Sequence, residues 1–225
     1  MSDLSEDGFC NSLYGEIQEA GTCGWYVRQS HVSLEKGLPT FGEDARVLEV
    51  GCNLGEHIPY VRHPYSEYLA TDYRQVAFEP LNSRTRFEVA DVQDLHFDDN
   101  SFDRIIMTCV LHHLDDPSAA LEEIRRVARN GAVISILLPN DPGMVYRLGK
   151  WVGPYRRLRK ELASIDPECF HYLQHRNHFP GLAALMRNKF KPDSMSRRNW
   201  PFPWKSWNFN LYSVYQIVVR KTSET

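Results

Sequence analysis

Three acidic residues stand where apolar, strand-like segments of the chain end. Glu49 lies in the last part of the apolar segment 46–50, and Gly51 and Gly55 follow it within the next five positions. Glycines at such a turn permit positive φ angles and let the backbone approach a ligand, which the amide groups of the turn then face. The pattern predicts a ligand-binding turn, although turns of this kind serve nicotinamide cofactors, flavins, phosphates and S-adenosylmethionine alike.

The other two acids narrow the choice of ligand. Asp72 ends the segment 68–72, 17 residues after Gly55, and Asp91 closes the segment 86–92. An acid at the end of the second strand can accept hydrogen bonds from both hydroxyls of a ribose. The acids therefore favour a cofactor that contains adenosine.

The three acids can lie at one edge of a sheet only if the strands that carry them are parallel and alternate with helices. Five segments have strand character, at 46–50, 68–72, 86–92, 102–110 and 132–138. We expect a short helix from Gly55 to residue 61, a weak one near 75–82, and a longer one that begins at Asp116-Pro117 and ends at Asn130-Gly131. Parallel neighbours need crossover connections, so this rhythm is typical of a doubly wound sheet.

The end of the chain predicts a different arrangement. A helix at 180–190 precedes two final strands at 194–200 and 210–220, which form a terminal hairpin. We therefore predict an α/β fold with a doubly wound, mostly parallel seven-stranded sheet and an antiparallel C-terminal edge. Residues 1–40 would form an N-terminal helical lid, and 41–225 the main domain with a substrate-shaping insertion at about 140–190.

The composition limits the class of protein. A chain of 225 residues, 42% of them hydrophobic, can bury one substantial core. Its net charge of −3 gives no reason to expect a nucleic acid as partner. The five cysteines form no CxxC pair, so we expect reduced thiols of a cytoplasmic protein and no bound metal. Neither a signal peptide nor a transmembrane segment is predicted.

The motifs resemble, in order and spacing, the class I S-adenosylmethionine-dependent methyltransferases that act on small molecules. Residues 47–55 are similar to the first motif of that family, Asp72 to the acid after its second strand, and 91–92 to the position beside the adenine. The strongest likeness is the segment 101–114, and the resemblance covers residues 45–138. It implies a Rossmann-like methyltransferase fold and S-adenosyl-L-methionine as cofactor.

Asn53 departs from the family pattern, because the family commonly has its middle glycine there. Asparagine tolerates left-handed conformations better than most residues, so we expect the loop to keep its shape. The resemblance implies that the cofactor lies against a set of residues from four strand ends. These are Glu49, Gly51, Cys52, Asn53, Gly55, Asp72, Tyr73, Asp91, Val92, Thr108 and His112.

Methyl transfer requires mainly that the protein hold the acceptor atom in line and exclude water. A general base helps when the acceptor is a hydroxyl or a protonated amine. The candidate bases are His31, His113, His175 and His178. The candidate substrate contacts are Tyr14, Asp141 and Arg176.

Beyond residue 138 the chain is similar to methyltransferases encoded with bacterial surface-polysaccharide pathways. The likeness lies in 138–143, in 175–178 and in the tryptophan-rich tail, and it implies a hydroxyl, or an amine, of a sugar or other metabolite as acceptor. The basic stretch from Arg147 to Lys160 fits a solvated helix face. It also fits contact with a phosphate-bearing or sugar-linked acceptor, or peripheral contact with an anionic membrane.

Two alternatives remain open. Tyr146 and Lys150 have the Y-x-x-x-K spacing of NAD(P)-dependent short-chain dehydrogenases, with Ser135 upstream, but no G-x-G-x-x-G occurs. A catalytically inactive methyltransferase-like binding protein would share the fold, and Asn53 is the only residue that supports it. Binding of S-adenosylmethionine, of NADH or of neither distinguishes the three hypotheses.

Overall fold

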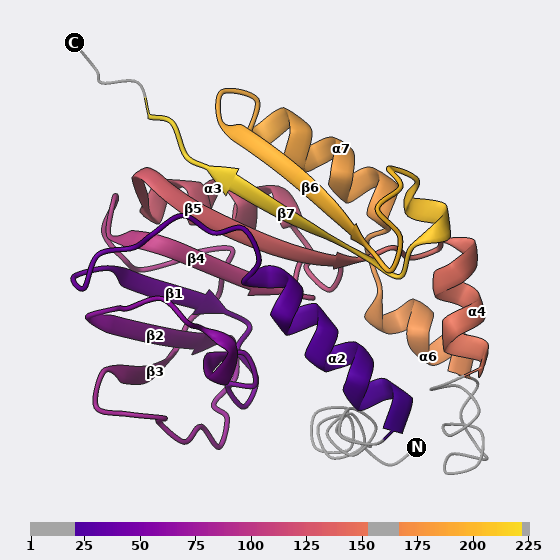
Figure 1. The fold of residues 1–225 in the computed structure, drawn as a ribbon, viewed down its shortest axis with the longest axis horizontal. Coiled ribbons are helices and arrows are strands. Elements are labelled where there is room, and N and C mark those ends of the chain that lie inside the picture. Colours follow the sequence, from indigo (N-terminus) through magenta and orange to yellow (C-terminus); the bar gives the residue numbers. More distant parts are fainter. Residues whose placement is uncertain (1–20, 153–166, 222–225) are drawn as a thin grey trace.

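The computed structural model describes residues 21–152 and 167–221, which include a single seven-stranded sheet (Figure 1). The strand order is β3-β2-β1-β4-β5-β7-β6. The strands are β1 Arg46–Val50, β2 Glu67–Asp72, β3 Thr85–Val89, β4 Phe102–Thr108, β5 Ala128–Pro139, β6 Ser194–Trp200 and β7 Tyr212–Val218. Strands β1 to β5 are parallel, while β7 pairs antiparallel with both β5 and β6. The predicted fold class is confirmed.

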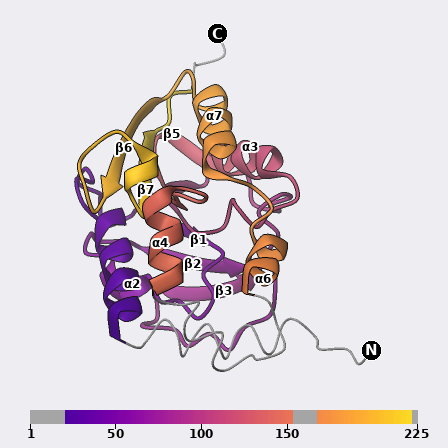
Figure 2. The same ribbon diagram turned by 90° about the vertical axis from the view of Figure 1, so that its right-hand side faces the viewer.

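The helices form a layer on each side of the sheet (Figures 1 and 2). They are α2 Gly21–Leu34, α3 Pro117–Val127, α4 Met144–Val152, α6 Pro167–Gln174 and α7 Phe179–Lys189, with 3₁₀ turns η1 Ile58–Tyr60 and η2 Trp207–Phe209. Buried residues of α3 and α7 pack in one cluster with one face of the sheet. Leu34 of α2 packs with Leu137 and Val214 on the opposite face.

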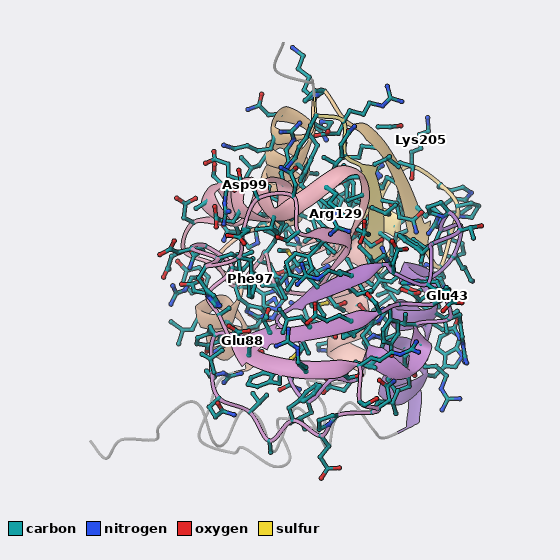
Figure 3. All side chains as sticks on the ribbon, turned by 90° about the vertical axis from the view of Figure 1, so that its left-hand side faces the viewer. Glu43, Glu88, Phe97, Asp99, Arg129 and Lys205 are labelled. Atoms are coloured by element: carbon teal, nitrogen blue, oxygen red, sulfur yellow. The ribbon has the colours of Figure 1, made fainter. Side chains whose placement is uncertain are left out.

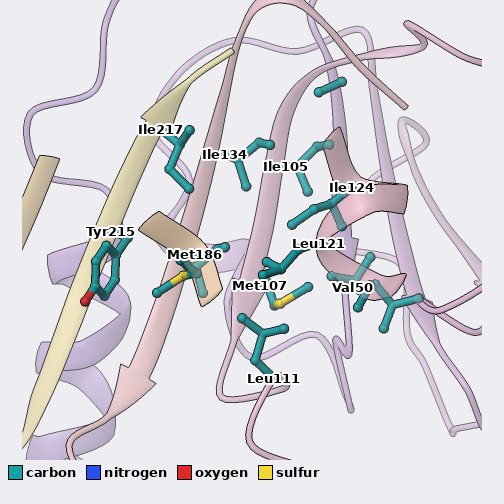
Figure 4. Close-up of a cluster of buried hydrophobic side chains, with 14 of the residues drawn as sticks. Val50, Ile105, Met107, Leu111, Leu121, Ile124, Ile134, Met186, Tyr215 and Ile217 are labelled. Atoms are coloured by element: carbon teal, nitrogen blue, oxygen red, sulfur yellow. The ribbon is translucent and has the colours of Figure 1, made fainter. Parts of the chain in front are cut away.

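The side-chain alternation of β4 shows how the sheet separates the two layers. Ile105 and Met107 point into the cluster that α3 and α7 cover, together with Ile134 and Ile217 of neighbouring strands (Figure 4). Successive strand residues point to opposite faces, so Arg104 lies on the face that α2 covers. Arg104 is fully buried there. One face of the sheet is therefore apolar, and the other contains charge.

The structure corrects three local predictions. No helix forms at 75–82, because Pro80 lacks an amide hydrogen and disfavours helical geometry at the preceding residue. The predicted helix from Gly55 to residue 61 is only the 3₁₀ turn η1. Helix α3 ends at Val127 rather than at Gly131, since Gly131 has a φ of 85° inside β5 and donates its amide to the carbonyl of Val219.

Charged side chains of both signs lie on the outer surface, among them Glu88, Asp99 and Arg129 (Figure 3). Arg129 pairs with Asp103 at 2.7 Å. Within the described residues, no helix combines the length and the apolar character needed to cross a membrane.

Candidate cofactor and acceptor site

The loop after β1 is built around left-handed residues. Gly51, Asn53 and Gly55 have φ angles of 68°, 47° and 85°. A Cβ atom at Gly51 would lie 2.3 Å from Cγ2 of Val110, which follows β4. Only glycine fits here, since both the conformation and the space exclude a side chain. The close approach also shows that this loop touches the end of β4.

Asn53 adopts the conformation that the sequence predicts. Its Nδ2 donates to Oε1 of Glu56 at 2.6 Å, and its backbone amide donates to Oδ2 of Asp72 at 3.2 Å. The side chain therefore closes the loop on itself, while the backbone ties the loop to the end of β2. The asparagine replaces a glycine without opening the turn.

Asp72 is held by backbone amides at the end of β2. It is 5% exposed, and its Oδ1 accepts from the amide of Arg74 at 3.2 Å. The Nε of Arg74 lies 3.8 Å from the same oxygen. A carboxylate offers about four acceptor sites, so the two amide bonds leave capacity for the hydroxyls of a ribose. Tyr73, beside it, is 65% exposed.

The end of β3 lies next along the same edge of the sheet. Asp91 is exposed, and its Oδ1 accepts from the amide of Gln93 at 2.9 Å, which forms a tight turn. Val92 is buried. Because β1, β2 and β3 are parallel neighbours, their predicted cofactor residues meet at one edge. We call this edge, where the parallel strands end, the carboxyl edge.

Glu49 and Cys52 lie beneath the loop. Glu49 is 2% exposed and accepts a hydrogen bond from the hydroxyl of Tyr68 at 2.7 Å. Burial raises the pKa of Glu49 to about 7. Burial and the nearby acids Glu49 and Asp72 also raise the pKa of Cys52, so this side chain is a thiol rather than a thiolate nucleophile.

The end of β4 presents two histidines. Leu111 is fully buried in the apolar cluster and anchors the turn that carries His112 and His113 (Figure 4). His112 is 4% exposed, whereas His113 is exposed. Thr108, at the strand end, has a buried hydroxyl with no hydrogen-bond partner among the described residues. This part of the carboxyl edge therefore contains polar groups that the described protein atoms leave open.

Five side chains from three segments form what we call the edge cluster. Its members are His112, His113, Asp141, His171 and His175. Oδ2 of Asp141 accepts from Nε2 of His171 at 2.8 Å and from Nδ1 of His175 at 3.2 Å. Burial opposes ionisation of Asp141, but the hydrogen bonds from His171 and His175 outweigh it and hold the pKa of Asp141 well below its usual range.

Three imidazoles of the edge cluster, those of His112, His113 and His175, are neutral near pH 7. Burial lowers the pKa of His175 to about 4, and burial together with neighbouring histidines takes the pKa of His112 well below 6.5. The packed protein around the base of the His113 ring displaces water and lowers its pKa, although the ring has an exposed edge and a hydrogen bond from its Nδ1 to the carbonyl of Gln174, at 2.7 Å, opposes the shift. These rings can accept a proton or coordinate a cation.

His31 lies in a different place from the other candidate bases. It belongs to a group on the α2 face that we call the sheet-face cluster, defined by His31, Glu35, His57 and Arg104. Nδ1 atoms of His31 and His57 are 3.0 Å apart, and Glu35 accepts from His57 at 3.0 Å and from Arg104 at 2.8 Å. Burial and the nearby His57 lower the pKa of His31 to about 3.

Of the remaining predicted substrate contacts and bases, some lie at the edge cluster and others do not. The structure brings Asp141 to His113 and His175 through the edge cluster, with Nδ1 of His178 3.9 Å from Oδ2 of Asp141. Arg176 is exposed and pairs with Asp115. Tyr14 lies outside the described residues, as does the basic stretch beyond residue 152.

Sequence reasoning missed His171, and it considered Lys150 only in the dehydrogenase alternative and the basic stretch, without relating it to Asp141. Lys150 lies 3.5 Å from Oδ1 of Asp141. His171 precedes His175 by four residues, which places both on one side of a helical turn. That spacing was the available signal, but the sequence does not show that the turn faces Asp141.

The comparisons with known proteins agree with this geometry. Residues 48–136 match the methyltransferase domain family. A demethylmenaquinone methyltransferase of Roseiflexus castenholzii is 37% identical over 113 residues, which are 46% of this chain and 47% of that protein. These matches support a class I S-adenosylmethionine-dependent methyltransferase, with the domain match lying in residues 48–136. The chain spans about half the length of this methyltransferase relative.

Solved structures share the methyltransferase fold over most of the chain. The YcgJ protein of Bacillus subtilis has a TM-score of 0.56 and 19% sequence identity, and the match covers 87% of this chain and 100% of that one. Phosphoethanolamine N-methyltransferase 2 of Haemonchus contortus, in complex with S-adenosylmethionine, has a TM-score of 0.64 and 13% identity, over 97% of this chain and 59% of that one.

The family assignment excludes the dehydrogenase alternative. The antiparallel β7 inserted between β5 and β6 matches the methyltransferase neighbours. Tyr146 and Lys150 do occupy one side of α4, with Nζ of Lys150 4.8 Å from the centre of the Tyr146 ring, but Lys150 is directed to Asp141. The Y-x-x-x-K spacing therefore belongs to the surroundings of the edge cluster in this methyltransferase.

Proposed function

We propose that the chain transfers a methyl group from S-adenosyl-L-methionine to a hydroxyl of a small-molecule acceptor, with a sugar as the first class to test. The observation that carries the proposal is the contact between the Gly51 loop and Val110. It puts the predicted cofactor loop beside the turn that holds His112 and His113. A cofactor half and a polar, imidazole-rich half therefore meet at one edge.

The cofactor half fits S-adenosylmethionine. Gly51 leaves room where a Cβ would collide, and the carboxylate of Asp72 retains acceptor capacity for the ribose. Asp91 and the backbone of Val92 would face the adenine. Around the methionine part of the cofactor would lie Glu49, Cys52, Asn53 and Gly55. The remaining sides of the cofactor would contact Tyr73, Thr108 and His112. When bound, the cofactor supplies an activated methyl group on a cationic sulfur.

The acceptor half favours a hydroxyl, because neutral imidazoles can receive the proton that a hydroxyl must lose. Among the predicted bases, His113 combines exposure with a fixed tautomer, since its Nδ1–H donates to the carbonyl of Gln174. Arg176 and Lys150 supply positive charge for a phosphate-bearing or sugar-linked acceptor, and Asp141 would orient His175. We infer further that 1–40 cover the site as a lid and that 140–190 shape the acceptor pocket.

Mass spectrometry on a panel of acceptors tests the proposal, with sugars and nucleotide sugars first and amines second. The expected product is about 14 Da heavier, because a methyl group replaces the hydrogen on oxygen and the net gain is one CH₂. Methylation of amines alone would contradict the hydroxyl assignment. Calorimetry with S-adenosylmethionine and with NADH separates enzyme from scaffold, since a chain that binds neither cofactor supports the inactive alternative.

Gly51→Ala tests the cofactor half directly. The new Cβ collides with Val110 at a residue with positive φ, so we expect cofactor affinity to fall by about 100-fold or more, equivalent to about 2.7 kcal/mol. Gly181→Ala is the matched control, because a Cβ there meets nothing within 4 Å. Equal cofactor affinity in the two variants would show that the loop does not bind the cofactor.

A further inference from the structure

We propose that His112, His113 and His175 bind a divalent zinc ion at the carboxyl edge. One ring nitrogen of each histidine lies within 4.8 Å of those of the other two. Ligand atoms in a tetrahedral zinc site with bonds of about 2.0 Å are about 3.3 Å apart, so the rings need to close by about 1.5 Å at most. The binding itself does not depend on the proposed methyl transfer.

Outer partners fix two of the three rings for coordination. Nδ1 of His175 donates to the carboxylate of Asp141 at 3.2 Å, and Nδ1 of His113 donates to the carbonyl of Gln174 at 2.7 Å. Histidines that bind metals almost always donate their second ring nitrogen to a carboxylate or a backbone carbonyl in this way. Each ring thus keeps its other nitrogen, Nε2, available as a ligand.

The third histidine provides an independent observation. Nδ1 of His112 is buried and has no hydrogen-bond partner among the described residues, and the side chain is only 4% exposed. A buried polar atom without a partner costs free energy, about 1–3 kcal/mol. A cation held with His113 and His175 would satisfy this nitrogen.

The two segments that carry the ligands are tied together. The amide of Asn177 donates to the carbonyl of His112 at 3.1 Å, and its side-chain amide donates to the carbonyl of Leu114 at 2.7 Å. Arg176 and Asp115 form an ion pair beside them. These contacts hold the ligand geometry in place before an ion arrives.

A second set of possible ligands, Asp141, His171 and His175, is less suitable. In this set the ligand atoms hydrogen-bond to one another, at 2.8 Å and 3.2 Å from Oδ2 of Asp141. Lys150 also places a positive charge 3.5 Å from the other oxygen of Asp141. That group is satisfied without an ion, whereas the three-histidine group is not.

Three imidazoles and no thiolate are a ligand set for zinc with a fourth position open. The exposed His113 places that position toward solvent. The role of the ion rests on the proposed function: it would bind the acceptor hydroxyl and lower its pKa, in place of base catalysis by His113, whose Nε2 it would occupy. The hydroxyl proton leaves to solvent, an oxygen lone pair forms the new C–O bond, and the C–S bond breaks with its electrons remaining on sulfur as a neutral thioether.

Metal binding by the tag-free chain tests the site. After treatment with a chelator, zinc titrated by calorimetry should bind one ion per chain, and Co²⁺ should give the visible spectrum of a low-coordinate site. His113→Ala should weaken zinc binding by about 100-fold or more, beyond the roughly 10–100-fold expected for Asp141→Asn as an outer partner. His113 is exposed, so its removal leaves the core packing unchanged, and circular dichroism checks the fold.

His96→Ala is the matched control, because His96 is exposed, pairs with Glu88 and lies outside the edge cluster. Zinc affinity that stays unchanged in His113→Ala would overturn the proposal, and a loss in His171→Ala alone would point to the other set. Calorimetry with S-adenosylmethionine is independent of these outcomes. If the chain binds S-adenosylmethionine but not zinc, the proposed metal site is wrong and the proposed methyl transfer stands. If the chain binds zinc but not S-adenosylmethionine, the proposed function is wrong.

Discussion

The molecule contains two buried histidine clusters of similar composition, and they differ in how their polar atoms are used. In the sheet-face cluster Glu35 bridges His57 and Arg104, and His31 completes the chain. Tyr60 stacks on His31 with ring centres 5.0 Å apart. In the edge cluster His113 is exposed. Among the described residues, each cluster has one buried nitrogen without a hydrogen-bond partner, Nε of Arg104 and Nδ1 of His112.

The difference separates a structural role from a ligand-binding role. Buried polar groups are tolerated in a core when they are paired, so the sheet-face cluster connects α2 to β4 as part of the scaffold. Open nitrogens at the edge where parallel strands end have no such explanation within the described protein atoms. Neither burial nor one unpaired nitrogen identifies a site, since both clusters have these features. The edge cluster differs in its position, because it lies where the parallel strands end and where open α/β sheets bind their ligands.

The largest expected effect tests the structural half of the comparison. Arg104→Met removes a fully buried cation and leaves the Glu35 carboxylate with His57 but without its guanidinium partner, so the free energy of unfolding should fall by about 3–5 kcal/mol. Urea denaturation measures it. Arg104→Met combined with Glu35→Gln should recover part of the loss, and a cost below about 1 kcal/mol for the single variant would show that the pair is not structural.

Glu49 lies between the two clusters and should make stability depend on pH. Its folded pKa of about 7 is above the unfolded value of 4.5, so its contribution is complete below pH 4.5 and is lost as the pH rises through 7. Glu49→Gln has no such dependence and can still accept the hydrogen bond from Tyr68.

The variant should therefore match the wild type near pH 4.5 and exceed its free energy of unfolding by about 3 kcal/mol at pH 8 and above. Urea denaturation across this range gives the difference between the two proteins. A constant difference at all pH values would show that Glu49 titrates normally. Cofactor affinity should fall in the same variant if Glu49 contacts the methionine part.

His113→Ala tests the functional half of the comparison. Removing an exposed imidazole should change the free energy of unfolding by less than about 0.5 kcal/mol, yet lower turnover by about 100-fold. His57→Ala is the matched contrast: His57 is 1% exposed, and its loss should cost about 1–3 kcal/mol because Glu35 and His31 lose a partner. If both variants lose mainly stability, the two clusters have the same role.

The smallest effect is expected at Asn53. Asn53→Gly relieves a left-handed residue but removes the hydrogen bond to Glu56, and each change is worth about 1 kcal/mol in opposite directions. The dissociation constant for S-adenosylmethionine should therefore change less than about threefold in calorimetry. A tenfold weakening would show that the Asn53 side chain contacts the cofactor, and a tenfold tightening would show that it hinders binding.

Residue order alone was enough for the sheet and for placing the strand-end acids at one edge of it. Strand periodicity, proline and glycine positions and acids at strand ends are local signals, and neighbouring parallel strands bring such ends together without further information. Gly51, Asp72 and Asp91 accordingly lie on one edge as predicted. The helix predicted at 75–82 is wrong because the prediction overlooked a local signal, Pro80, which disfavours helical geometry; in the extended segment Phe78 packs on Phe87.

Tertiary structure decided what the histidines do. His112 and His175 are separated by 63 positions in the sequence, and only the packing of α6 against the turn after β4 joins them. The same is true of Arg104 and Glu35, which the sequence does not mark as partners. Side-chain pairing across distant segments depends on how irregular connections pack, and no spacing rule along the chain contains that information.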